Sequence, residues 1–350
     1  MPSPEATARF LLLFGTSRSG TSWLGKILDS HPQTLYKHEP DRSGLGLPFA
    51  PTLDQAGQYR DSILDFVDRL AANNTTHSAA RLPVFRKQYR ASIADPIHRF
   101  SVFASGAASS LGWQVPVLQC ANVNSPSVRV VWKSTDSLAR LGVILRALDN
   151  NYRAVRTVRH PCGYISSVLR GEARHKFIAS VRSSEDYGIM QALITATRAA
   201  SRGLTLDHMR QFHPVERMAW IWVLMNEKAE DDTRSDPRCI SVRYEDVCRD
   251  PVNQSRALFS FLGLDWSSQT EDFIRASTLA SQPAGLNRIT QDSRRYYSIF
   301  RNPLKAAEKW KSEMKPENIA RVYRVLRQSD LIRMYPESDE SELRVPARES

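Results

Sequence analysis

The stretch from Phe10 to Leu24 constrains the fold of this 350-residue chain more than any other part of it. Five apolar residues in a row lead into the small-residue turn Gly15–Gly20, and apolar side chains then recur at helical spacing from Trp23 to Leu28. A short apolar run that stops at glycine and serine is typical of a buried strand that ends in a loop. The stretch therefore predicts a strand, a loop and a helix.

The loop between this strand and this helix has the chemistry of an anion-binding site. The first N–H groups of a helix lack intrahelical partners, and the helix dipole makes that end positive. Glycine and serine let the backbone approach an anion closely, while Thr21 and Ser22 add hydroxyl donors and Arg18 adds a permanent charge. We interpret residues 15–23 as a phosphate cradle, although the pattern alone is equally typical of an ordinary strand-to-helix turn.

The spacing within this loop separates two classes of nucleotide site. Gly15, Gly20 and Ser22 fit the Walker A frame, but Thr21 stands where that frame requires a lysine. Because the lysine contacts the β- and γ-phosphates of a nucleoside triphosphate, its absence argues against an ATPase or a kinase. The cation of this loop is Arg18 instead. A P-loop-type nucleotide kinase or hydrolase is therefore kept as the alternative function.

Composition limits the classes of protein to which the chain can belong. Its apolar fraction of 41% and charged fraction of 24% are ordinary for a globular protein. No apolar run approaches the ~18–20 residues of a membrane span, so we expect a cytoplasmic protein without a membrane span. The net charge of +11 favours anionic ligands. Because this charge is spread along the chain and not gathered in a basic tail, nucleic acid is not the expected partner.

The cysteines give no indication of a metal site or of a disulfide framework. Four cysteines in a chain of this length contain no CxxC pair, which argues against a zinc ribbon. We expect them to be reduced core residues, and we predict no metal site. They are Cys120, Cys162, Cys239 and Cys248.

Strands and helices alternate along the rest of the chain, which is the pattern of a parallel sheet. The carboxyl ends of such strands lie at the edge of the sheet where ligands bind. Polar residues at these ends, His38 and Glu39, Lys133, and Arg159, are therefore site candidates. We expect the end of the second strand to lie beside the end of the first. The further strands are predicted at residues 35–40, 128–133, 154–159 and 239–243.

Several separated segments together resemble the sulfotransferases that use PAPS, 3′-phosphoadenosine 5′-phosphosulfate. The loop at 15–23 resembles their 5′-phosphosulfate loop, and residues 159–167, Arg-His-Pro-Cys-Gly-Tyr-Ile-Ser-Ser, resemble their 3′-phosphate motif. Residues 242–246 and 261–264, Val-Arg-Tyr-Glu-Asp and Phe-Leu-Gly-Leu, are similar to a further block of the family. Residues 301–310 are similar to the C-terminal segment of its carbohydrate branch. The resemblance covers residues 9–335 outside 41–128 and 171–213.

The resemblance implies a fold and a reaction. The fold is α/β, with a three-layer parallel sheet flanked by helices, as in the P-loop-like sulfotransferases. A single sulfotransferase domain would span residues 1–350, with acceptor-side insertions near 41–128 and 171–213. We expect a disordered tail at 336–350. The reaction moves the sulfonate of PAPS to a hydroxyl of a carbohydrate or of a glycosylated or small-molecule acceptor, releases PAP and needs no metal.

The resemblance also implies roles for individual residues. Lys133 would lie beside the transferred sulfonate, together with Arg18. Cytosolic members carry a catalytic histidine two residues after that lysine, where this chain has Thr135, so their mechanism does not transfer. Carbohydrate and bacterial members use a glutamate after the second strand, which matches Glu39 as the base, with His38 as the competing base. The residues implied to hold the donor are Arg18, Ser19, Gly20, Thr21, Ser22 and Trp23 at the 5′-phosphosulfate, and Arg159, Ser167 and Arg301 at the 3′-phosphate.

Overall fold

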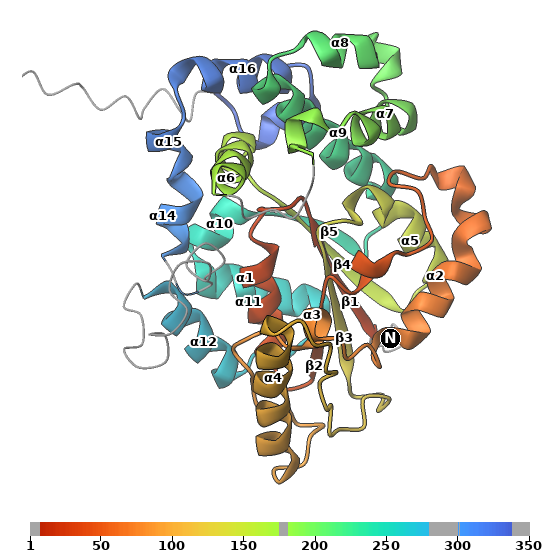
Figure 1. The fold of residues 1–350 in the computed structure, drawn as a ribbon, viewed down its shortest axis with the longest axis vertical. Coiled ribbons are helices and arrows are strands. Elements are labelled where there is room, and N and C mark those ends of the chain that lie inside the picture. Colours follow the sequence, from red (N-terminus) through yellow and green to blue (C-terminus); the bar gives the residue numbers. More distant parts are fainter. Residues whose placement is uncertain (1–7, 175–180, 280–299, 301, 338–350) are drawn as a thin grey trace, which may run out of the picture. The chain divides into compact units, whose positions relative to one another are not determined.

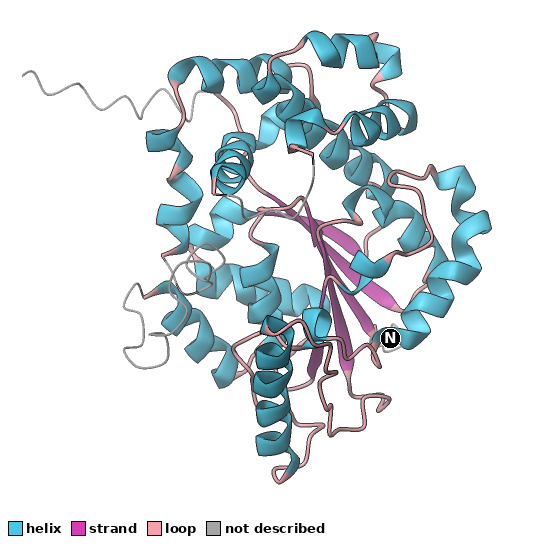
Figure 2. Ribbon diagram, viewed as in Figure 1, coloured by secondary structure: helices cyan, strands magenta, loops and turns pink. Residues whose placement is uncertain are grey.

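The computed structural model describes residues 8–174, 181–279, 300 and 302–337. The chain divides into two compact units (Figure 1). The first unit runs to Arg159 and includes Asp232–Ala307, and the second comprises His160–Asp231 and the residues from Glu308 onward. All strands of the described residues belong to the first unit, whereas the described regular elements of the second unit are helices (Figure 2).

The first unit is built on a five-stranded sheet whose strand pairs are all parallel, in the order β2-β3-β1-β4-β5. The three central strands are almost completely buried, because helices cover both faces of the sheet. The predicted α/β class, with a parallel sheet between helices, is confirmed. The strands are β1 (Phe10–Gly15), β2 (Thr34–His38), β3 (Arg129–Ser134), β4 (Tyr152–Val158) and β5 (Cys239–Arg243).

The strand order corrects one expectation about the site. The ends of β1 and β2 do not lie side by side, because β3 is inserted between them. His38 at the end of β2 is paired in register with Lys133 of β3, and Lys133 is paired in turn with Leu13 of β1. The chain after β2 therefore meets the end of β3 first.

Helices on opposite faces of the sheet create a switch point between β1 and β3. The helix α1 (Thr21–Asp29), which follows β1, packs on one face with α11 (Pro251–Leu262) and α12 (Ser268–Thr278) (Figure 1). The helix α5 (Leu141–Ala147), which follows β3, packs with α2 (Ala56–Leu70) on the other face. The loops after β1 and β3 thus diverge, and such a divergence is where open α/β sheets bind ligands.

The remaining helices include several that the sequence did not predict. The insertion near 41–128 contains the 17-residue helix α4, which was not predicted. Residues 303–326 form three short helices, and the last of them starts at Pro316, because a residue that precedes a proline disfavours helical backbone. The elements not yet given are α3 (Thr76–Ala79), α4 (Ala94–Ser110), α6 (Pro161–Ala173), α7 (Tyr187–Ala196), α8 (Leu206–Gln211), α9 (Pro214–Thr233), α10 (Tyr244–Arg249), α14 (Pro303–Glu308), α15 (Trp310–Glu313) and α16 (Pro316–Leu326).

The second unit has an aromatic core of its own around His160. The imidazole of His160 stacks on Trp310 with ring centroids 4.4 Å apart, and Tyr335 packs edge-on against it at 4.8 Å. Its Nε2 lies 3.2 Å from the hydroxyl of Tyr323. The histidine of the Arg-His-Pro segment is therefore a packing residue of this unit.

None of the described helices combines the length and the apolar character needed to cross a lipid bilayer. All four cysteines are free thiols; Cys162 and Cys248 are buried, and Cys120 and Cys239 are partly buried.

Candidate active site

The loop after β1 has the tight backbone that an anion cradle requires. Gly20, which precedes α1, has a φ of 87°, and a Cβ at this position would lie 2.2 Å from the ring of Tyr244. Arg18 adopts a left-handed backbone with a φ of 65°, which is uncommon for a residue with a side chain. No side chain caps the N-terminus of α1, so its first N–H groups stay available for an anion. The predicted strand, loop and helix are confirmed.

Hydroxyl groups around this loop fit an anionic ligand. The side-chain oxygens of Thr16, Ser19 and Thr157 are buried and have no hydrogen-bond partner among the described residues. Buried polar atoms without partners are rare, and phosphate or sulfonate oxygens would accept from such hydroxyls. The loop and its surroundings therefore combine unsatisfied hydroxyls, an uncapped helix start and the charge of Arg18, which together can bind an anion.

The last residues of this loop differ in where their side chains lie. Thr21 is buried and Ser22 is exposed. The indole of Trp23 is buried in the core and donates a hydrogen bond of 3.0 Å to the hydroxyl of Ser277. Only the backbone of Trp23 is thus directed at the loop, where its N–H donates to the carbonyl of Gly20.

Arg159 is joined to the same loop. Its Nη1 donates to the backbone carbonyl of Arg18 at 2.8 Å, and its Nη2 donates to the carbonyl of Ala306 at 2.8 Å. The guanidinium also lies over the ring of Tyr244, 5.3 Å from its centroid. The structure therefore brings Arg18 and Arg159 together from the ends of the neighbouring strands β1 and β4. Of the other two residues predicted at the 3′-phosphate, Ser167 is buried on α6 of the second unit, and Arg301 lies outside the described residues.

A second cluster lies at the ends of β2 and β3. Glu39 directly follows β2 with a left-handed backbone, φ 44° and ψ 52°. Its N–H donates to the carbonyl of Lys133 at 2.8 Å, and the buried Nζ of Lys133 donates to Glu39 Oε1. The hydroxyl of Thr135 donates to the same oxygen at 2.9 Å. The structure therefore joins two predicted catalytic residues in an ion pair.

Burial and charge act in opposite directions on this pair. Burial disfavours the carboxylate of Glu39, but its polar contact with His77 and the charge of Lys133 outweigh burial, so the pKa of Glu39 lies well below its usual value. Burial lowers the pKa of Lys133, an effect that Glu39 opposes. Burial, aided by Lys133 and Arg81, lowers the pKa of His38 well below its usual value. At neutral pH Glu39 is therefore ionised and His38 is neutral.

Sequence reasoning missed three residues that support this cluster. Asp41 accepts hydrogen bonds from Trp132 Nε1 at 3.1 Å and Ser134 Oγ at 2.6 Å, which ties the turn after Glu39 to the end of β3. His77 and Arg81 reach the cluster from α3 and the segment after it. No motif marks these two residues, because only the packing of α3 against β2 brings them near Glu39.

Several known proteins are similar to this chain. Residues 9–333, which run through both units, match the family described as Sulfotransferase domain. Human carbohydrate sulfotransferase 6 is 26% identical over 338 residues, which cover 89% of this chain and 77% of that protein. Mouse carbohydrate sulfotransferase 3 is 38% identical over 85 residues, only 24% of this chain and 16% of that relative. Among solved structures, the sulfotransferase domain of the Synechococcus PCC 7002 olefin synthase superposes with a TM-score of 0.44 at 17% identity, covering 92% of this chain and 96% of that one.

Proposed function

Because the chain belongs to the sulfotransferase domain family, we propose that it transfers the sulfonate of PAPS to a hydroxyl of a carbohydrate or glycosylated small-molecule acceptor. The observation that carries this proposal is the pairing of Glu39 with the buried Lys133 at the same edge of the sheet as the anion loop. The names of the relatives, carbohydrate sulfotransferases 6 and 1, support the acceptor class. The cytoplasmic location stays a prediction.

The donor has two anionic ends, and each would have its own residues. The 5′-phosphosulfate would be held by the N–H groups of residues 20–22, by the hydroxyls of Ser19, Thr21 and Ser22, and by the charge of Arg18, with no metal required. Thr21 in place of the Walker lysine favours a sulfonucleotide over a nucleoside triphosphate. The 3′-phosphate would be held by Arg159, while the roles expected for Ser167 and Arg301 stay predictions from the sequence.

In the transfer step Glu39 accepts a proton and two cations stabilise the negative charge that develops. As the acceptor oxygen forms its bond to sulfur, its proton passes to the Glu39 carboxylate. The bond between sulfur and the bridging oxygen breaks, and its electron pair leaves on the 5′-phosphate of PAP. Negative charge therefore grows on the bridging oxygen and on the sulfonate oxygens, where Arg18 and Lys133 would stabilise it.

The ion pair between Glu39 and Lys133 would couple this step to donor binding. While Lys133 holds Glu39, the pKa of the carboxyl is low and the carboxylate is a weak base. The sulfonate of the donor offers Lys133 a second anion, and a shift of Lys133 toward it would raise the pKa of Glu39. Glu39 would thus become an effective base only when the donor is bound.

Transfer of radiolabelled sulfonate from PAPS to a panel of sugars, glycolipids and glycosylated natural products tests the proposal. Glu39→Gln should lower turnover about 10²–10⁴-fold, the usual contribution of a positioned base, and leave PAP affinity near that of the wild type. Glu317→Gln, at an exposed position on α16, is the matched control and should keep full activity. A wild-type protein that binds PAP but labels no hydroxyl acceptor would contradict the proposal, and a fully active Glu39→Gln variant would move the base to His38.

A further inference from the structure

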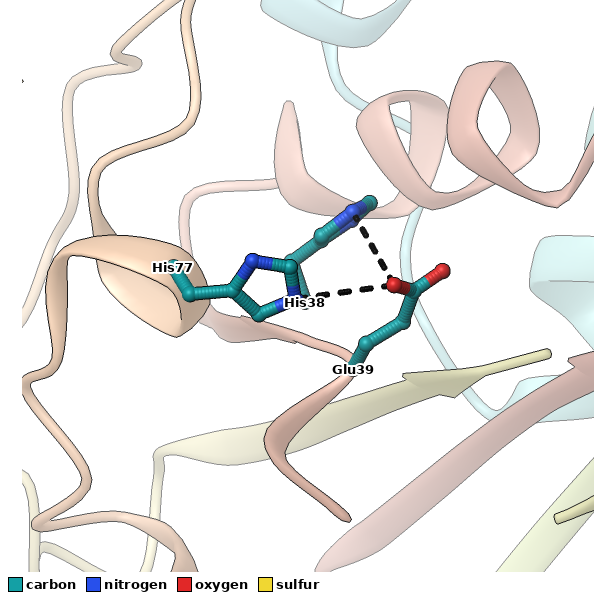
Figure 3. Close-up of side chains that lie close together, drawn as sticks. All are labelled: His38, Glu39 and His77. Carbon is teal, nitrogen blue, oxygen red and sulfur yellow. Dashed lines mark ion pairs between the residues drawn. The ribbon is translucent and has the colours of Figure 1, made fainter. Parts of the chain in front are cut away.

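Two imidazoles converge on one oxygen of the Glu39 carboxylate (Figure 3). His77 Nε2 lies 3.5 Å from Oε2, and His38 Nε2 lies 3.9 Å from the same atom. The other oxygen, Oε1, accepts from Lys133 and Thr135. The two carboxylate oxygens therefore have different partners, and His77 is the closer of the two histidines to Oε2.

Arg81 determines which nitrogen of His77 carries the proton. Its Nε donates to the backbone carbonyl of His77 at 3.1 Å, and its Nη2 lies 3.0 Å from His77 Nδ1. A guanidinium has donors only, so Nδ1 must be the acceptor and the proton of the neutral ring must sit on Nε2. This Nε2 is shielded from solvent and has no hydrogen-bond partner within the described residues; the nearest charged oxygen is Glu39 Oε2.

The same tautomer argues against a metal ion between these groups. His38, Glu39 and His77 offer ligand atoms within 4.8 Å of one another, which resembles a two-histidine, one-carboxylate site. A metal needs a deprotonated ring nitrogen. Binding through Nε2 would move the proton of His77 to Nδ1, where it would face the donor groups of Arg81. The geometry therefore favours His77 as a hydrogen-bond donor through Nε2 and not as a metal ligand.

We propose that His77, held in its Nε2–H tautomer by Arg81, is a positioning residue for Glu39. It donates to Oε2 and keeps Oε1 turned toward Lys133, Thr135 and the acceptor hydroxyl. The separation of 3.5 Å is longer than a formed hydrogen bond, and such contacts commonly shorten when the reacting complex forms. This inference rests on the proposed role of Glu39 as the base.

The charged and titratable groups that face Glu39 come from several elements. They are Tyr36 and His38 on β2, His77 on α3, Arg81 after α3, Lys133 on β3 and Asp136 after β3. The contact of His77 with Oε2 favours the ionised form of Glu39. Its removal therefore raises the pKa of Glu39, and the acidic limb of the activity profile should move to higher pH.

Nitrogen-15 NMR of histidine-labelled protein tests the tautomer without donor or acceptor. The signal that disappears in His77→Gln identifies His77, and in the wild type it should show a protonated Nε2 and an unprotonated Nδ1. Arg81→Met should convert it to a mixture of tautomers. A wild-type His77 protonated at Nδ1 would overturn the proposal, and this measurement does not depend on whether the protein transfers sulfonate.

Steady-state kinetics test the positioning role. His77→Ala should lower kcat roughly 10- to 100-fold, the effect of losing a hydrogen bond to a charged group. The KM for PAPS should stay near that of the wild type, and the acidic limb of the activity profile should move to higher pH. His77→Gln, whose amide can donate from a similar place, should restore part of the activity, and His208→Ala, at an exposed histidine of α8, should behave as the wild type. A His77→Ala variant with unchanged kcat and pH profile would refute this role and leave the sulfotransferase proposal intact. Absence of wild-type activity would refute the sulfotransferase proposal and, with it, the positioning of a base.

Discussion

Two residues with left-handed backbone mark the candidate site at the scale of single residues. Arg18 and Glu39 each lie at the carboxyl edge of the sheet, in the segments that follow β1 and β2, with φ values of 65° and 44°. A side chain in this region costs on the order of 1–3 kcal/mol, and such strain collects at functional sites. Hydrogen bonds hold both segments: Arg159 donates to the carbonyl of Arg18, and the N–H of Glu39 donates to the carbonyl of Lys133. The strain is therefore maintained by the neighbouring strand ends.

Gly20→Ala should disrupt the anion loop more than the cost of placing alanine in a left-handed backbone alone would. The new Cβ would lie 2.2 Å from the ring of Tyr244. We expect PAP binding to be lost and the free energy of unfolding to fall by roughly 1–3 kcal/mol, as for other overpacked sites, measured by denaturant unfolding. Gly46→Ala is the matched control, because Gly46 has a φ of 71° but nothing within 4 Å of an added Cβ. Equal losses in the two variants would contradict the steric account.

At the scale of elements, α1 is anchored by a buried ion-pair cluster at its C-terminal end. The carboxylate of Asp29 accepts from Lys26 at 2.6 Å and lies 3.0 Å from Lys87. Burial disfavours the charge on Asp29, but Lys26 and Lys87 outweigh burial and lower the pKa of Asp29 below 3.8. The cluster fixes the helix whose other end forms the anion loop.

Asp29→Asn should destabilise the protein by roughly 3–5 kcal/mol at pH 7, because it leaves two buried ammonium groups without their carboxylate. Asp29 contributes fully to the free energy of unfolding above its pKa in the unfolded chain, near 3.8. This contribution is lost as the pH falls through the lower pKa that Asp29 has in the folded protein. The stability gap between wild type and variant should therefore narrow below pH 4 in urea unfolding. Asp65→Asn, which removes an exposed pair with Arg69, should cost less than about 1 kcal/mol. A gap that does not change with pH would contradict the assignment.

The elements differ in how well the sequence predicts them. Strand β1 was predictable because its continuous apolar run stops at a turn of small residues, and the other strands because short segments rich in apolar residues end at polar tips. Helix α4 was not, because Ile97, Phe100 and Phe103 are exposed, so its apolar residues do not mark a buried face. The site candidates followed from their positions at strand ends. The contact between Glu39 and Lys133 did not, because it depends on the insertion of β3 beside β2, which local sequence does not encode.

At the scale of the whole molecule, the carboxyl edge of the parallel sheet gathers the chemistry of the first unit. The anion loop follows β1, His38 and the proposed base Glu39 lie at the end of β2, Lys133 lies near the end of β3, and Arg159 follows β4. The net charge of +11 adds a favourable long-range field for an anionic donor. The central claim is that the loop of Arg18 binds a sulfonucleotide without a metal.

Calorimetric titration of PAP in the presence of EDTA tests that claim most directly. The wild type should bind PAP equally well with EDTA and with Mg²⁺. Arg18→Ala should bind about 10- to 100-fold more weakly, the effect of losing a charge-assisted contact, while Arg333→Ala, at a side chain 83% exposed, should bind as the wild type. Binding that requires Mg²⁺, or an Arg18→Ala variant with wild-type affinity, would contradict the claim.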